Sequence, residues 1–542
     1  MQTALIRSEQ FNIGHLCSRF QCELGLGGKT ALRWLGAHEE RVDYTFSDLE
    51  RHSSRFANVL QRLGYSPGEV FFIFLPKVPE VYFTFLGALK ARLITGTLFS
   101  NFGEEALLDR LGDAGANVVL TRHSYLKKLL RIRERLPSLR HIILVDANEH
   151  PSADILSYAQ LMKNASDDYE TPVTPPETPS VLHYTSGSTG KPKGALHCHR
   201  SVLLQSRTAA EVLSLQPHDL YWCTADHGWV TGTSYGIIGP WSLGITQVHF
   251  GGAYDAAKWL QILEQYRITI WYTAPTALRM LMREDPALFE RVDLSRLRHI
   301  FSVGEPLNPE VISWARKALR HDIYDTWWQT ETGAIMITNR PGLAIKPGSM
   351  GKPLAGVEAA VVADDGRALP DNEQGNLCLK PGWDAMFISY FHHEDVYRQK
   401  FKYGWYWTGD TAYRDQDGYY WFQGRSDDVI NTSGHLVSPF EVESALLEVP
   451  GIAESGVIGA PDELHWQKIV AFVALHEGYE WNSDLALKAR LHISNRVSPM
   501  ATPQEFYVLA HIPKTKSGKI MRRVLRARYL GTDAGDVSTL DI

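Results

Sequence analysis

The chain has 542 residues, a formal net charge of −6 at pH 7 and 44% hydrophobic residues. This length exceeds one ordinary hydrophobic core, and a prior of about 150 residues per domain suggests three or four folding units. The lack of a general basic charge argues against nucleic acid as the main partner, so any affinity for phosphate has to be local.

Cysteine usage and the N-terminal residues bear on the compartment. The five cysteines are an odd number spread thinly over the chain, which argues against a disulfide framework and for a reducing environment. The first ten residues lack the apolar core of a signal peptide, and no uninterrupted run of about 18 apolar residues occurs in the sequence. We therefore expect a soluble cytoplasmic protein that does not bind membranes.

The first part of the chain alternates helical and strand patterns. Ser47 to Glu50 reads as a capping box, and the apolar stripe Leu49, Phe56 and Leu60 predicts a helix that ends before Gly64. Short apolar runs predict strands at 70–75, 117–121 and 141–145, and an internal helix at 79–91. This alternation predicts an α/β unit, followed by a solvated, proline-rich connection at 165–180.

The loop at 184–194 reads YTSGSTGKPKG. Its glycines allow the backbone to wrap round an anion, its hydroxyl groups can donate hydrogen bonds, and its lysines supply positive charge. It is not a Walker A loop, because Lys191 is followed by Pro192, which offers no hydroxyl for magnesium. The composition predicts a phosphate cradle, and the plain alternative is a surface loop that only connects two elements.

Beyond this loop the pattern changes twice. Helix and strand signals at 256–266, 269–272, 297–303 and 322–326 predict a second α/β unit. A β-rich region follows from about residue 348, with turn signals at 364–366 and 415–418. After Arg425, the pattern predicts a small α+β domain with helices at 441–447 and 485–496 and strands at 453–459, 468–475 and 505–509.

Three further segments carry residues suited to nucleotide chemistry. The first, YDTWWQTETG at 324–333, offers Glu331 as a magnesium ligand and Trp327 as a surface for a purine; a helix cap with core tryptophans is the alternative. The second pairs Asp410 in WTGD with Arg425 in GRSDD, where a carboxylate can hold the hydroxyls of a ribose; a surface salt bridge is the alternative. The third, PKTKSGKIMRR at 513–523, places Lys519 on a flexible loop, and a solvated basic face is the alternative.

Histidines invite a metal interpretation that the spacing does not support. His197 and His199 could share one face of a strand, but no second ligand pair lies at the required spacing. His435 is better explained as structural than as a general base, since a carboxylic acid substrate is already ionised at pH 7.

Taken together, the four motifs over about residues 180–520 resemble the adenylate-forming superfamily, and most closely its short-chain acetyl-CoA synthetases. The resemblance implies ATP and coenzyme A as substrates, Mg²⁺ at Glu331, and Lys519 as the catalytic lysine. It places the ATP site at Thr185, Ser186, Gly187, Ser188, Thr189, Gly190, Lys191, Gly304, Glu305, Pro306, Asp325, Thr326, Trp327, Trp328, Gln329, Thr330, Asp410 and Arg425.

The same resemblance predicts a narrow acid pocket. Trp328 would lie across its end, and Val230, Thr231 and Val303 would complete the wall, so acetate is expected first and propionate second. CoA is expected at Ser433 and Gly434. Leu436, where the family usually has arginine, and Trp466, where it usually has glycine, put the thioester half-reaction in doubt.

The implied architecture is a large N-terminal domain of two α/β sheet units and a β-rich unit, spanning 1–426. A small mobile α+β domain at 427–542 would carry Lys519 and turn about a hinge at Asp427. The expected reaction converts an acid, ATP and CoA into acyl-CoA, AMP and pyrophosphate through an acyl-adenylate. The alternatives are transfer to a carrier protein or another acceptor, and a nucleotide sensor without catalysis. In related enzymes acylation of this lysine stops activity, so an acetyltransferase and a deacetylase are expected partners; the sequence leaves the oligomeric state open.

Overall fold

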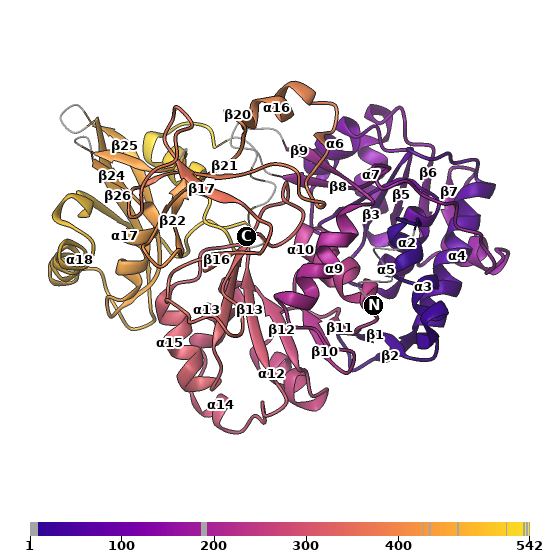
Figure 1. Cartoon of the computed structure of the whole chain (residues 1–542), viewed down its shortest axis with the longest axis horizontal. Helices are drawn as coiled ribbons and strands as arrows, with labels where there is room; N and C mark the ends of the chain where they lie inside the picture. The colour runs from indigo at the N-terminus through magenta and orange to yellow at the C-terminus, as the bar shows by residue number, and fades with distance from the viewer. Residues whose placement is uncertain are drawn as a thin grey trace.

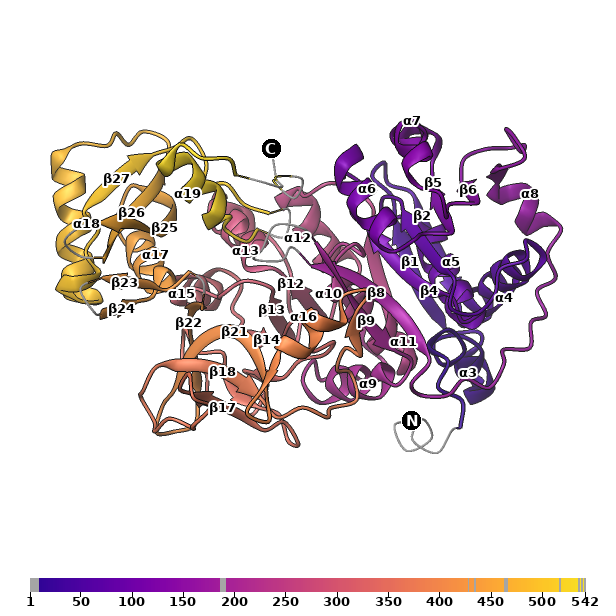
Figure 2. The ribbon, with the colours of Figure 1, turned by 90° about the horizontal axis from the view of Figure 1, so that it is seen from above.

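The computed structural model describes residues 9–185, 192–426, 428–432, 435–462, 466–515 and 518–534, together with residues 537 and 540. Over these residues the chain forms four β-sheets with helices packed on them, which confirms the expected α/β class. Within the same ranges, none of the helices combines the length and the hydropathy that a membrane span requires. Figures 1 and 2 both place the N-terminal unit at one end of the molecule and the C-terminal unit at the other.

The first sheet has the strand order β19-β9-β8-β4-β3-β5-β6-β7. Its strands are β3 (Val70–Phe74), β4 (Ile94–Leu98), β5 (Val118–Thr121), β6 (His141–Leu144), β7 (Ile155–Ser157), β8 (Pro179–Thr185), β9 (Lys193–Cys198) and β19 (Ser389–Tyr390). Strand β3 reads VFFIF and is buried throughout, because helices cover both faces of the sheet. Phe71 and Ile73 face one core, and Phe72 and Phe74 face the other.

The helices on this sheet explain the alternation seen in the sequence. They are α4 (Phe46–Arg62), α5 (Pro79–Lys90), α6 (Glu104–Asp113), α7 (His123–Ile132), α8 (Tyr158–Lys163) and α9 (Ser201–Glu211). Helices α4 and α5 belong to the core of Phe71, whereas α6 and α7 belong to the core of Phe72. The predicted capping box was wrong by two residues: Thr45 is the N-cap of α4, and Asp48 completes the box, because each side chain bonds the other's backbone amide.

The second sheet has the order β16-β15-β14-β13-β12-β10-β11-β1-β2. Its strands are β1 (Thr30–Leu35), β2 (Arg41–Thr45), β10 (Leu220–Cys223), β11 (Thr246–Phe250), β12 (Ile270–Thr273), β13 (His299–Val303), β14 (Ile323–Trp327), β15 (Ile337–Thr338) and β16 (Lys352–Pro353). The two α/β units are therefore interleaved rather than consecutive. Strands β1 and β2 precede the first sheet in the chain but pair into the second, where β1 lies parallel to β11.

Helices pack on both faces of the second sheet as well. They are α10 (Val230–Thr233), the π-helix η3 (Ser234–Ile238), α11 (Gly239–Ser242), α12 (Ala256–Gln265), α13 (Pro275–Met282), α14 (Ala287–Glu290) and α15 (Pro309–Ala318). Strand β12 again sends alternate side chains to different cores: Trp271 packs with α12, α13 and α15, while Tyr272 packs with η3 and Trp328.

The remaining sheets form the β-rich unit and the C-terminal unit. The former contains β17 (Ala359–Val362), β18 (Gly375–Leu379), β20 (Phe401–Lys402), β21 (Trp405–Arg414) and β22 (Tyr420–Arg425), with α16 (Glu394–Gln399). The latter contains β23 (Ile430–Thr432), β24 (His435–Val437), β25 (Ile452–Asp462), β26 (Trp466–Leu475) and β27 (Glu505–Val508), with α17 (Pro439–Leu447), α18 (Ser483–Arg496), the 3₁₀ helix η4 (Pro499–Ala501) and α19 (Arg522–Leu530).

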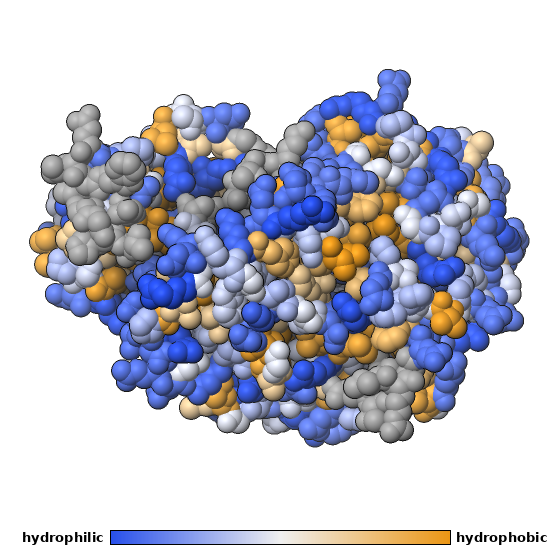
Figure 3. Space-filling view, turned by 45° about the horizontal axis from the view of Figure 1, so that its top comes forward, coloured by the Kyte–Doolittle hydropathy of each residue, from blue (hydrophilic) through white to orange (hydrophobic). Residues whose placement is uncertain are grey.

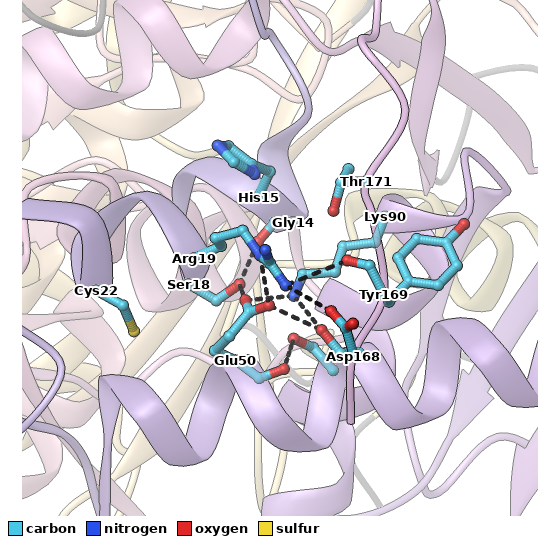
Figure 4. A network of polar contacts seen from close by, with 12 residues as sticks. Gly14, His15, Ser18, Arg19, Cys22, Glu50, Lys90, Asp168, Tyr169 and Thr171 are labelled. Carbon is cyan, nitrogen blue, oxygen red and sulfur yellow. Dashed lines mark hydrogen bonds and ion pairs between the residues drawn. The ribbon is translucent and has the colours of Figure 1, made fainter. Parts of the chain in front are cut away.

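A buried ionic network fixes the short helices α2 (Ile13–Leu16), α3 (Arg19–Gln21) and the π-helix η1 (Cys22–Leu26) to α4 and α5 (Figure 4). Glu50 of α4 pairs with the fully buried Lys90 of α5, and accepts hydrogen bonds from Ser18 (2.8 Å) and Arg19 (3.0 Å). Burial alone would raise the pKa of Glu50, but the charge and hydrogen bond of Lys90 lower it to about 2. The pair thus stays ionised inside the protein.

Candidate active site

A cavity of about 680 Å³ lies where the large N-terminal part of the chain meets the C-terminal unit. Strands β12, β13 and β14 run parallel, and ligands of open α/β sheets bind at the carboxyl edge of such strands. Strand β13 delivers Val303 to Pro306 to the cavity, and β14 delivers Asp325 to Glu331. In Figure 3 hydrophilic side chains cover most of the visible face, and apolar side chains gather near its middle.

Most predicted ATP-binding residues within the described ranges line this one cavity. They are Thr185, Gly304, Glu305, Pro306, Asp325, Thr326, Trp327, Trp328, Gln329, Thr330, Asp410 and Arg425, together with Glu331 and Lys519. The motifs are far apart in the sequence, and the fold brings them together. Ser186, Gly187, Ser188, Thr189, Gly190 and Lys191 lie outside the described residues.

The two strands that flank the phosphate loop form an antiparallel hairpin. Thr185 at the end of β8 pairs with Lys193 at the start of β9, and both line the cavity. The two residues that flank the predicted phosphate loop therefore share the cavity with the other motifs. The cationic side chain of Lys193 adds to the positive charge that favours phosphate there.

Asp410 and Arg425 face each other across the pair β21 and β22. A guanidinium nitrogen of Arg425 lies 2.9 Å from Oδ1 of Asp410, and the Asp410 side chain is only 6% exposed. The other oxygen, Oδ2, accepts from Trp327 Nε1 at 3.0 Å and from Gln329 Nε2 at 2.9 Å. Two segments thus fix one buried carboxylate, while its partner Arg425 is 28% exposed.

Glu331 lies on the loop that follows β14. Tyr390 of β19 donates its hydroxyl to Oε1 of Glu331 at 2.6 Å, which leaves the second oxygen for another partner. No group of three or more His, Cys, Asp or Glu side chains gathers at metal-binding distance within the described ranges. A magnesium ion at Glu331 would therefore take most of its oxygen ligands from nucleotide phosphates and water, as Mg²⁺ often does.

His197 supports this loop and does not pair with His199. Its ring nitrogens lie 2.9 Å from the carbonyl oxygen of Thr330 and 3.1 Å from that of Ala385. His199 lies beyond the end of β9, and its Nδ1 accepts a hydrogen bond from the Ile13 amide at 3.0 Å. The expectation that these histidines are structural agrees with these contacts.

Two buried polar atoms at the cavity have no partner among the described residues. Asp325 is 8% exposed and its Oδ1 accepts no hydrogen bond, while burial raises the pKa of its carboxyl to about 8. The hydroxyl of Thr231 is similarly buried and unpaired. Such atoms are costly unless a ligand or water completes them, so both suit a bound polar ligand.

The four predicted acid-pocket residues meet on one side of the cavity. Val230 and Thr231 begin α10, Val303 ends β13, and Trp328 follows β14. Val230, Val303 and Trp328 belong to the same apolar core, so this end of the cavity is lined mainly by apolar side chains. The indole nitrogen of Trp328 donates to the hydroxyl of Tyr272 at 3.2 Å.

The turn Gly304-Glu305-Pro306 has two different neighbours. Gly304 has φ of +96°, and a Cβ at this position would lie 2.1 Å from the ring of Trp229, so only glycine fits. The Glu305 side chain pairs with Arg279 and accepts from Thr276 Oγ1 at 2.7 Å. The Glu305 side chain is therefore held by neighbouring protein groups.

Lys519 reaches the cavity from the C-terminal unit. Its loop is closed by hydrogen bonds between Thr515 and Lys519, and Gly518 packs against Thr276 of α13. Burial among protein atoms lowers the pKa of the Lys519 amine, and the charge of Arg425 lowers it further. The side chain remains open to the cavity space itself.

The remaining predictions cannot be placed. Asp427, Ser433 and Gly434 lie outside the described residues, as do the side chains of Leu436 and Trp466. Other contributors were missed by the sequence analysis: Tyr390, Trp229, Arg279 and Tyr272. A lone tyrosine or arginine outside a motif carries no local signal, and its role depends on which distant strand lies beside it.

Comparison with known proteins agrees with this geometry. The family model "AMP-binding enzyme" matches residues 24–390, and "AMP-binding enzyme C-terminal domain" matches residues 441–519. The acetyl-coenzyme A synthetase of Bacillus subtilis (strain 168) is 46% identical over 515 residues, covering 95% of this chain and 90% of the relative. The acetyl-coenzyme A synthetase of Escherichia coli (strain K12) is 38% identical over 544 residues, covering 95% and 83%.

Solved structures give the same result. The crystal structure of an anthranilate CoA ligase in complex with anthranoyl-AMP superposes with a TM-score of 0.88 at 30% identity, over 97% of this chain and 98% of that one. A benzoate CoA ligase from Burkholderia xenovorans LB400 gives 0.84 at 25% identity, over 95% and 99%. The chain therefore belongs to the AMP-binding enzyme family, as an adenylate-forming acyl-CoA synthetase close to the acetyl-coenzyme A synthetases.

Proposed function

We propose that this protein joins acetate to coenzyme A at the expense of ATP, with AMP and pyrophosphate as the other products. The observation that carries the proposal is the meeting of Glu331, the Asp410–Arg425 pair and Lys519 at one cavity beside a narrow apolar pocket. Acetate is the preferred acid and propionate the second, because Trp328 leaves room for only a short chain.

In the first half-reaction, a carboxylate oxygen of acetate attacks the α-phosphorus of ATP. The bond from that phosphorus to the bridging oxygen of pyrophosphate breaks, which leaves acetyl-AMP. Lys519 supplies a positive charge where negative charge develops on the α-phosphate. Asp410 accepts hydrogen bonds from the ribose hydroxyls, and Arg425 orients Asp410. Thr185, Ser186, Gly187, Ser188, Thr189, Gly190 and Lys191 hold the phosphates.

The residues present fit a magnesium ion at one position. Glu331 would hold it through the carboxylate oxygen that Tyr390 does not occupy, and the ion would neutralise charge on the departing pyrophosphate. The unpaired Oδ1 of Asp325 suits the amino group of adenine, and Trp327 offers its ring face to the base. The backbone of Gly304, Glu305 and Pro306 forms the opposite side.

In the second half-reaction, the thiol sulfur of CoA attacks the acyl carbon of acetyl-AMP. The bond from that carbon to the phosphate oxygen breaks, AMP leaves, and the thiol proton is released. The unit 427–542 turns about Asp427 between the two steps, while 1–426 keeps the acyl-adenylate. This boundary fits the end of β22 at Arg425 and the start of β23 at Ile430. Ser433 and Gly434 contact CoA.

Acetate-dependent exchange between ATP and labelled pyrophosphate tests the first step, and detection of acetyl-CoA tests the second. Exchange without a CoA thioester would favour a carrier protein or another acceptor. Binding of ATP without exchange would favour a sensor, although Lys519 and Glu331 weigh against it. A panel of acids with ATP and CoA then ranks the substrates.

Leu436 bears on the acceptor, because arginine offers up to five donors and a fixed charge, and leucine offers neither. Leu436→Arg should lower the KM for CoA roughly ten- to a hundredfold and leave pyrophosphate exchange unchanged, since a charge-assisted contact is worth about 1.5–3 kcal/mol. A parent enzyme that already saturates at micromolar CoA, with no gain from arginine, would mean that another basic residue makes the contact.

Control of the enzyme is proposed to act on the same lysine. Acetylation removes the charge of Lys519, so an acetyltransferase and a deacetylase would switch adenylation off and on. A cytoplasmic location suits the five cysteines, all of which are free. Mass spectrometry of Lys519 in protein from growing cells, together with activity measured before and after deacetylation, tests the proposed control by acetylation.

A further inference from the structure

The indole of Trp328 is held by a chain of hydroxyl groups with a single direction. Trp328 Nε1 donates to Tyr272 Oη at 3.2 Å, and the Tyr272 and Thr326 hydroxyls lie 2.7 Å apart. Thr326 Oγ1 lies 2.7 Å from the carbonyl oxygen of Ser302, to which it donates. Because the Thr326 proton is used on that carbonyl, Tyr272 donates to Thr326 and accepts from the indole.

The hydroxyl groups of this hydrogen-bonded chain are buried. Tyr272 is 0% exposed and Thr326 is 3% exposed, so bulk water compensates poorly for a lost partner. Tyr272 comes from β12, Thr326 from β14 and Ser302 from β13, which are neighbouring parallel strands. The indole is thus tied to three neighbouring strands of the second sheet. A buried hydrogen bond that is left unmade costs free energy, which favours this arrangement.

A second tyrosine limits the indole from another side. The ring of Tyr235 meets that of Trp328 edge to face, with centroids 5.1 Å apart and an interplanar angle of 80°. The Tyr235 hydroxyl accepts from the Ile335 amide at 2.8 Å and lies 2.7 Å from Thr208 Oγ1. Tyr235 therefore fills space beside the indole, whereas Tyr272 is the one described residue that bonds its nitrogen.

We propose that Tyr272 determines acid specificity as a positioning residue, by holding the Trp328 indole across the end of the acid pocket. This inference rests on the proposed function. Without the Tyr272 hydroxyl, the indole loses the bond that selects one rotamer, and the pocket admits a longer acid at low cost. Tyr272 itself does not touch the acid, and it acts only through Trp328.

Tyr272→Phe removes one oxygen and keeps the ring. We expect the ratio of kcat/KM for butyrate to that for acetate, measured by pyrophosphate exchange, to rise roughly three- to tenfold, which corresponds to one lost hydrogen bond. The KM for ATP should stay near the parental value. An unchanged ranking of acids in a folded Tyr272→Phe protein would overturn the inference.

Two other tyrosines of the same apolar core serve as controls, because they distinguish an effect on acid specificity from an effect on protein stability. Tyr221→Phe removes a buried hydroxyl that has no oxygen or nitrogen partner in the described part of the chain, and should change neither property. Tyr235→Phe removes two hydrogen bonds and should lower the Tm without altering the ranking of acids. If Tyr235→Phe shifts the selectivity as much as Tyr272→Phe does, the cause is loosened packing of the core, and the inference about the Tyr272 hydrogen bond is wrong.

A double-mutant cycle with Trp328→Phe gives the sharpest test. Phenylalanine has no ring N–H, so adding Tyr272→Phe to Trp328→Phe should produce no further shift in selectivity. Additive shifts would contradict the proposed bond. Thr326→Val, which removes the acceptor of the Tyr272 hydroxyl, should shift selectivity in the same direction and replaces Tyr272→Phe if that variant does not fold. A parent without acetate-dependent exchange would instead refute the proposed function.

Discussion

Lys519 is the single residue on which the two half-reactions are expected to differ most. Lys519→Ala should abolish acetate-dependent pyrophosphate exchange and spare conversion of supplied acetyl-AMP and CoA into acetyl-CoA. A charge-stabilising group in a closed site is worth about 2.7–4 kcal/mol, or roughly a hundred- to thousandfold in rate. Equal losses in both assays would contradict the assignment, and Lys488→Ala, on the exposed side of α18, serves as the control.

Trp328 is the residue that we propose sets the length of the acid. Trp328→Gly should move the preference from acetate to acids of four or more carbons, because removal of the indole opens the end of the pocket. Each newly buried methylene contributes about 0.8 kcal/mol, so two could change selectivity by roughly tenfold or more. Rate constants for acetate, propionate, butyrate and valerate with parent and variant give the ranking; a folded variant with the parental order would refute the pocket.

The residues recovered from the sequence share one property: they lie in short motifs whose chemistry is complete within a few positions. Asp410 and Arg425 could be paired by resemblance, and the structure places them 2.9 Å apart. Tyr272 and Tyr390 could not be found this way. Each acts on a motif residue from a distant strand, and no pattern near Tyr272 or Tyr390 records that neighbour.

At the scale of elements, the buried Glu50–Lys90 ion pair between α4 and α5 makes the free energy of unfolding depend on pH. Because the pKa of Glu50 falls from its ordinary 4.5 to about 2, its contribution is complete above pH 4.5 and is lost as the pH falls toward 2. Urea unfolding of the parent from pH 7 to pH 2 should therefore show stability declining across this window.

Glu50→Gln removes that proton-linked contribution. The variant should have a shallower decline below pH 4.5, and at pH 7 it should be less stable by about 3–5 kcal/mol, because Lys90 is left as a buried charge without its partner. Adding Lys90→Met should restore much of this loss. Glu149→Gln, on the exposed surface, is the control. If the stability of Glu50→Gln falls as steeply below pH 4.5 as that of the parent, other carboxylates cause the decline.

Local patterns predicted most elements but not the membership of the sheets. The run VFFIF at 70–74 could only be a buried strand, and α5 could only be internal. The sequence does not indicate that β1 pairs with β11, which begins more than two hundred residues later. That pairing depends on the packing of α11 and of Trp241, whose indole donates to the Ala31 carbonyl at 3.0 Å.

At the scale of the whole molecule, an ionic contact joins the large N-terminal part of the chain to the C-terminal unit. Arg283, at the end of α13, donates to the Ala453 carbonyl at 2.8 Å and lies 3.3 Å from Glu454 of β25, which also pairs with Lys514 at 2.9 Å. These bonds contribute to the arrangement that presents Lys519 to the cavity, together with the hydrogen bond between Asn308 and Ser444 at 2.7 Å. The proposed turn of the C-terminal unit requires them to break.

Arg283→Ala should slow pyrophosphate exchange about three- to tenfold, since Arg283 is partly exposed and water screens the contact. Transfer from supplied acetyl-AMP to CoA should be unchanged or faster. Single-turnover assays of each half-reaction provide the comparison, with Arg291→Ala at the end of α14 as the control. Slower transfer from supplied acetyl-AMP would indicate a general loss of structure.

The ring of Trp229, which directly precedes Val230 of the predicted acid pocket, lies against Gly304 of the turn proposed for the adenine side, and both residues line the cavity. Two ligands that press on opposite sides of one ring cannot bind independently. By thermodynamic linkage, the factor by which ATP changes the affinity for acetate must equal the factor by which acetate changes the affinity for ATP. If acetate and ATP occupy the proposed sites on either side of this ring, titrating each substrate with and without the other should therefore give one and the same factor.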